Sequence, residues 1–180
     1  AAVNYLGYMA GALLAASLSD LQLKDRLYRL GLLLAVLSTA GMALTENFYL
    51  WALWRFIAGL SSAGSMLIAS GLIMHWLLSH QQRAELGVHF AGLGLGIAMS
   101  ALLVEGMLQL QLDWQSQWLY LAGIGVLLAI PAWRWLPRPV LPLLQTQQGF
   151  IDRPPSSRFT RLMLLSYFCA GYGYVISATF

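Results

Sequence analysis

Long apolar stretches separated by short polar turns constrain this chain more than any other feature. Six stretches are apolar over most of their length, and they cover residues 1–18, 27–44, 48–78, 84–108, 114–136 and 159–180. A helix needs about 20 such residues to cross a hydrocarbon core of about 30 Å. The stretches lack the two-residue alternation of a membrane strand, and in lipid only helices and closed barrels satisfy the backbone. We therefore expect an all-α polytopic membrane bundle with about five complete helices and most of a sixth.

The composition excludes the soluble classes of protein. Hydrophobic residues make up 59% of the chain and charged residues 9%, whereas an ordinary soluble domain has roughly 25% charged residues. Intrinsic disorder needs the opposite balance. The formal net charge is +3, but the basic residues are scattered among apolar blocks, which favours a role in membrane orientation over nucleic-acid binding. The lone Cys169 is expected to be a buried packing thiol.

Basic side chains fall in alternate connections between the apolar stretches. Lys24 and Arg26 precede the second stretch, Arg29 lies at its start, and Arg83 precedes the fourth. The remaining ones, apart from Arg55, lie at or beyond the end of the fifth: Arg134, Arg138, Arg153, Arg158 and Arg161. The connections next to Glu46 and Asp113 contain no Lys or Arg. By the positive-inside rule, the loops at 19–28, 79–84 and 137–158 are cytoplasmic.

The tryptophans give an independent indication of the same orientation. All of them fall near an expected membrane interface, where amphipathic rings are favoured. Those near outer helix ends are Trp51, Trp54, Trp114 and Trp118, and those near inner ends are Trp76, Trp133 and Trp135. Beyond Trp135, prolines 137, 139 and 142 end the fifth stretch. Residues 137–158 are then expected to be a polar linker, and both chain ends look like cuts through helices of a longer protein.

Small residues recur at helical spacing in three of the stretches. Gly7 with Gly11, Gly59 with Ala63, and Gly92 with Gly96 each form a small-xxx-small face. Such faces let helix backbones approach closely in lipid, and the alternative is that some of them line a transport pathway. The glycines at 92–96 lack the spacing and the preceding strand of a dinucleotide loop. The three histidines do not share a metal-binding helix face, so we expect no metal. We also expect no cofactor and, because no convergent nucleophile and base are evident, no enzyme.

Arg55 is the most informative single residue. It lies about eight residues inside the third stretch, or roughly 12 Å from its outer end. A charge at that depth is costly unless it is paired or hydrated. One interpretation is snorkelling to the outer interface beside Trp51 and Trp54. The other is a functional cation that faces a polar cavity, binds an anionic substrate group or lowers a carboxylate pKa.

Three local motifs resemble the major facilitator superfamily. The segment from Ala16 to Arg26 resembles the family's loop between helices two and three, with matches at Leu18, Asp20 and Lys24. The segment Arg55-Phe56-Ile57-Ala58-Gly59 resembles the Arg-x-x-x-Gly motif of family helix four. The glycines at 92, 94 and 96 resemble the run of family helix five, although Ile97 replaces its proline. The tyrosine-rich segments 4–8 and 167–174 are most similar to the bacterial YbfB/YjiJ-type branch.

The resemblance implies that residues 1–136 form the N-terminal bundle without its first helix. It also implies that residues 137–158 form the inter-bundle linker and that residues 159–180 begin the C-terminal bundle. It implies secondary active transport of a small molecule by alternating access in a bacterial inner membrane, with protons as the coupling ion. Arg55 and Gly59 would serve substrate or proton coupling, and Asp20, Lys24 and Arg26 would form a cytoplasmic gate. The expected partners are lipid and a small-molecule substrate, without nucleic acid. The alternatives are a non-transporting membrane scaffold or sensor and, third, a membrane enzyme.

Overall fold

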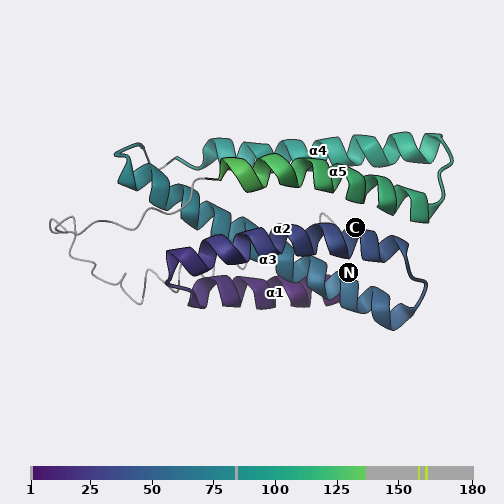
Figure 1. The fold of residues 1–180 in the computed structure, drawn as a ribbon, viewed down its shortest axis with the longest axis horizontal. Coiled ribbons are helices and arrows are strands. Elements are labelled where there is room, and N and C mark those ends of the chain that lie inside the picture. The colour runs from purple at the N-terminus through teal and green to yellow at the C-terminus, as the bar shows by residue number, and fades with distance from the viewer. Residues whose placement is uncertain (1, 84, 137–157, 159–160, 162–180) are drawn as a thin grey trace. The chain divides into compact units, whose positions relative to one another are not determined.

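The computed structural model describes residues 2–83, 85–136, 158 and 161. Its helices are α1 (Ala2–Ser17), α2 (Leu21–Ala43), α3 (Phe48–Ser79), α4 (Gly87–Gln109) and α5 (Trp114–Trp135). The described residues contain no strand. Helices α2 to α5 are each long and apolar enough to cross a membrane. The prediction of an all-α polytopic membrane bundle is confirmed (Figure 1).

The chain divides into two units, residues 1–140 and 141–180. All five helices belong to the first unit. In the second unit the structure describes Arg158 and Arg161, which are both helical. The expected linker at 137–158 and the sixth helix at 159–180 otherwise lie outside the described residues. These boundaries stay predictions.

The observed start of α2 corrects one sequence prediction. We expected a loop at 19–28, whereas α2 already begins at Leu21. The Asp20 carboxylate accepts a hydrogen bond from the backbone N–H of Gln22 at 2.9 Å, so it caps the helix. The charged residues that follow are good helix formers, and Asp25 pairs with Arg29 one turn later. The charged residues after Leu21 predicted a loop, but in the structure they form the polar first turns of α2.

Helices α3 and α4 end in the same backbone motif. After α3, the N–H groups of Gln81 and Gln82 donate to the carbonyls of Leu78 and Leu77 at 3.1 and 2.9 Å. After α4, Gln111 and Leu112 repeat this pattern on Leu108 and Met107. Gln81 and Gln111 are the left-handed residues of these turns, with φ of 54° and 52°. Both ends are therefore Schellman motifs, in which the backbone itself satisfies terminal carbonyls.

Backbone-to-backbone packing joins α1 to α3. A Cβ added to Gly7 would overlap the carbonyl oxygen of Phe56, and one added to Gly59 would overlap that of Asn4. A Cβ on Gly11 would lie 3.1 Å from the Ala63 Cβ. Helix α2 packs on both α3 and α5, and its Tyr28 lies in a buried cluster with Ala15, Ile68, Ala69 and Leu72.

Helix α4 makes far less contact within the described part of the chain. Met107 is its one buried residue there. Nothing described lies within 4 Å of a Cβ added at Gly92, Gly94 or Gly96. A packing role for Gly92 and Gly96 therefore stays a prediction that concerns contacts beyond the described residues.

Candidate functional site

Two groups of side chains lie at opposite ends of the helices, and the first surrounds Arg55. This residue is half-buried on α3, two turns past the Asn47 cap. Its guanidinium carbon lies 5.8 Å from the Trp51 ring centre and 5.4 Å from that of Trp118 on α5. Both distances suit cation–π attraction. No carboxylate of the described residues lies within ion-pair distance of Arg55.

Further aromatic contacts tie this end of α3 to its neighbours. The Trp51 indole N–H donates to the Met42 carbonyl at the end of α2 at 3.2 Å. The Trp51 and Trp114 rings meet edge to face, with centres 6.0 Å apart. A shallow groove beside them is lined by Glu46, Phe48, Trp51 and Trp114. We call Trp51, Arg55, Trp114 and Trp118 the outer aromatic cluster.

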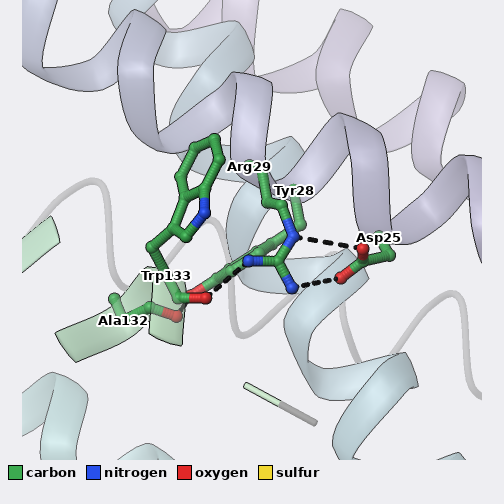
Figure 2. A network of polar contacts seen from close by, with 5 residues as sticks. All are labelled: Asp25, Tyr28, Arg29, Ala132 and Trp133. Atoms are coloured by element: carbon green, nitrogen blue, oxygen red, sulfur yellow. Dashed lines mark hydrogen bonds and ion pairs between the residues drawn. The ribbon is translucent and has the colours of Figure 1, made fainter. Parts of the chain in front are cut away.

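The second group lies where α2 begins and α5 ends (Figure 2). Asp25 and Arg29 form a bidentate ion pair on α2, with contacts of 3.1 and 2.9 Å, and their side chains are only 15% and 12% exposed. Arg29 also donates to the backbone carbonyl of Trp133 and lies 5.3 Å from the Trp133 ring centre. The Tyr28 hydroxyl donates to the Ala132 carbonyl at 3.4 Å. We call Asp25, Tyr28 and Arg29, with the carbonyls of Ala132 and Trp133, the inner clip.

The residues predicted to form a cytoplasmic gate are close in sequence to the inner clip, but they take no part in its hydrogen bonds or ion pair. Asp20 is the cap of α2. Lys24 and Arg26 lie on the first turns of α2, and Arg26 is exposed. The ion pairs among the described residues are Asp25–Arg29 and Arg83–Glu85, so they include neither Lys24 nor Arg26. A gating role for these three residues stays a prediction.

Sequence reasoning missed the clip itself. Of its side chains, only Arg29 was named from the sequence, as one of the basic residues near the start of the second apolar stretch. The available signal was the four-residue spacing of Asp25 and Arg29, which brings opposite charges together on a helix. The acceptors on α5 carry no such signal, because they are backbone carbonyls.

The other predicted site residue on α3, Gly59, contacts α1, and its role in substrate or proton coupling stays a prediction. Its missing side chain makes room for the backbone of Asn4 and Tyr8. Gly59 therefore brings α1 against the helix that carries Arg55 one turn away. Among the described residues no group of three or more His, Cys, Asp or Glu could hold a metal ion. His89 instead lies 3.1 Å from the Ser70 hydroxyl on α3.

Comparison with known proteins identifies the family. A family model described as "Uncharacterised MFS-type transporter YbfB" matches residues 1–180. The chain is 32% identical over 94 residues to the "Efflux pump radE" of Floropilus chiversii, a match that covers 52% of this chain and 18% of the relative. It is 37% identical over 71 residues to the "MFS-type transporter phm3" of Pyrenochaetopsis sp, which covers 39% and 15%.

The chain thus spans less than a fifth of the length of these curated relatives, and no solved structure matches it. The family match nevertheless covers every residue, and it agrees with the all-helical, membrane-spanning fold. The resemblance inferred from the motifs is confirmed. The chain belongs to the YbfB-type family of major facilitator superfamily transporters.

Proposed function

We propose that the protein containing this chain carries a small molecule across a bacterial inner membrane by alternating access, and that Arg55 takes part in substrate or proton coupling. Family membership supports transport in general. In transporters of this kind two bundles rock around a midplane site. In this proposal residues 1–136 belong to the first bundle, and Asp20, Lys24 and Arg26 gate its cytoplasmic end.

The observation that carries the proposal for Arg55 is its charge in a half-buried, aromatic setting. The charge of Arg55 within α3 needs stabilisation. The Trp51 and Trp118 rings supply part of it, worth about 0.5–2 kcal/mol in general. The described carboxylates are not paired with it. The guanidinium can therefore bind an anionic substrate group, or lower the pKa of a carboxylate brought near it during the cycle.

The test is transport by the intact protein in proteoliposomes, with a panel of organic anions and cations and with or without an imposed pH gradient. Arg55→Ala should abolish uptake while insertion into the membrane is unchanged. Arg55→Lys keeps the charge but loses the planar donor fork, and should retain partial activity. Arg83→Ala is the matched control, because it removes the same charge from a side chain that is 91% exposed.

The outer aromatic cluster favours a second role for Arg55, as an anchor between α3 and α5. In that case Arg55→Ala would lower thermal stability but leave the transport rate per folded molecule unchanged. That result would overturn the coupling proposal. Absence of transport by the intact protein for every compound, with and without the gradient, would favour a scaffold or sensor.

A further inference from the structure

The end of α5 differs from the ends of α3 and α4. Those two helices satisfy terminal carbonyls with Schellman bonds, whereas the residue after α5, Leu136, is extended, with φ −65° and ψ 120°. In a continuing helix the Trp133 carbonyl would accept from the N–H of residue 137. Residue 137 is a proline and has no N–H. The Trp133 carbonyl therefore has no donor in the backbone of its own helix, and a side chain from another helix can supply one.

Helix α2 supplies that donor. The Arg29 guanidinium donates to the Trp133 carbonyl, and the Tyr28 hydroxyl adds a longer bond to the carbonyl before it (Figure 2). The two donors are adjacent in sequence, more than a hundred residues from their acceptors. A guanidinium also suits the negative end of the α5 dipole. One side chain thus provides both the hydrogen bond and the charge that a helix end requires.

Asp25 determines where the Arg29 guanidinium lies. It binds two guanidinium nitrogens, Nε and Nη2, and leaves Nη1 for the Trp133 carbonyl. Because Asp25 and Arg29 lie one turn apart on the same helix, their ion pair does not itself join α2 to α5. The Trp133 ring covers another part of the guanidinium. Asp25 and Trp133 therefore aim Arg29 at the end of α5.

From these contacts we infer that Arg29 is a positioning residue for the end of α5. The inner clip acts as a C-terminal cap of α5 that the neighbouring helix α2 supplies. It fixes this helix end where Pro137 leaves the Trp133 carbonyl without its backbone donor. The expected inter-bundle linker at 137–158 begins directly after this end. The clip would then set the point at which the linker leaves the first bundle. This inference does not depend on Arg55 or on the identity of a substrate.

Hydrogen exchange of the full chain in detergent tests the inference at the amides of residues 133–135, in the last turn of α5. Arg29→Ala should speed their exchange about tenfold, the loss expected for a charge-assisted hydrogen bond. Arg29→Gln keeps an N–H donor without the charge and should fall between Arg29→Ala and the native chain. Arg26→Ala is the matched control, because it removes the same charge from an exposed position on α2. It should leave these amides unchanged.

A double substitution separates capping from general packing of α2 on α5. Pro137→Ala returns an N–H to residue 137, so in the Arg29→Ala background it should restore most of the lost protection. Equal exchange in Arg29→Ala and Arg26→Ala would overturn the inference. So would a failure of Pro137→Ala to slow exchange in a double variant whose helix content matches the native chain. If Arg29→Ala does not fold, the comparison of Arg29→Gln with Arg26→Ala decides the same question.

Discussion

Gly59 shows how one missing side chain determines where a whole helix lies. A Cβ at this position would overlap the backbone of Asn4 on α1, and a backbone cannot move aside like a flexible side chain. Gly59→Ala should therefore lower the free energy of unfolding by about 1–3 kcal/mol, the usual cost of overpacking. Thermal unfolding of the detergent-solubilised protein measures this change.

Gly64, on the same helix, is the matched control for Gly59. Nothing lies within 4 Å of a Cβ added there among the described residues. Gly64→Ala should stabilise α3 slightly, because alanine favours the helix over glycine by up to about 1 kcal/mol. Equal shifts in the two variants would contradict the assignment of Gly59 to the contact with α1.

Asp113 is the residue from which we expect a pH effect. The Ser116 hydroxyl and the Ser116 backbone N–H, the latter 3.1 Å from the carboxylate, lower the pKa of Asp113 below its usual range. The folded-state pKa is thus lower than the unfolded one. The stabilisation is fully present above the unfolded pKa, and it is lost as the pH falls through the folded pKa.

The comparison for Asp113 is Asp113→Asn, which keeps a good helix cap but cannot titrate. The difference in melting temperature between the native chain and this variant should shrink, or change sign, as the solution is acidified. A difference that stays constant from neutral to strongly acidic pH would show that the carboxylate charge does not contribute to the start of α5.

At the scale of the element, two substitutions at Asp20 distinguish its capping role at the start of α2 from its proposed gating role. Asp20→Ala removes the acceptor for the Gln22 N–H and should cost about 1 kcal/mol of stability. Asp20→Asn removes the charge but keeps the cap, so its stability should match the native chain. If transport by the intact protein is lost in Asp20→Asn, the carboxylate has a role in gating beyond the cap. Equal loss of stability in both variants would contradict the capping role.

Helix bounds could be predicted well where apolar runs meet polar caps. The expected stretch 48–78 became Phe48–Ser79, and 114–136 became Trp114–Trp135. Asn47 and Asp113 cap these helices, and each comes directly before the apolar run. The predicted start of α2, at residue 27, was six residues too late because the first turns of this helix are polar. Hydrophobicity marks the part of a helix that lies in lipid, and α2 continues as a helix past it.

The contacts within the outer aromatic cluster and the inner clip were harder to predict than the helices. Tryptophan positions indicated that Trp51 and Trp114 lie near the same interface, and they are in contact. Arg55 stood out because a charge is rare in an apolar run. The inner clip gave no such signal, since its acceptors are carbonyls whose availability depends on how α5 ends.

At the scale of the whole described unit, the inner clip and the outer aromatic cluster each connect helices, and they do so at opposite ends of the unit. The inner clip joins the start of α2 to the end of α5, and the outer aromatic cluster meets the end of α2 and the starts of α3 and α5. The turns α2–α3 and α4–α5 lie together at the right of Figure 1, opposite the turn α1–α2. The two turns at the right contain no Lys or Arg, whereas Lys24 and Arg26 lie on the first turns of α2, next to the α1–α2 turn. This arrangement supports the proposed orientation across the membrane.

Cysteine accessibility in intact cells tests that orientation most directly. In a Cys169→Ser background, single cysteines replace the exposed residues Gln22, Glu46, Gln82 and Gln111. We predict that positions 46 and 111 react with a membrane-impermeant maleimide from outside, and that positions 22 and 82 react only after the cells are permeabilised. Labelling of position 22 or 82 from the same side as 46 and 111 would contradict the account.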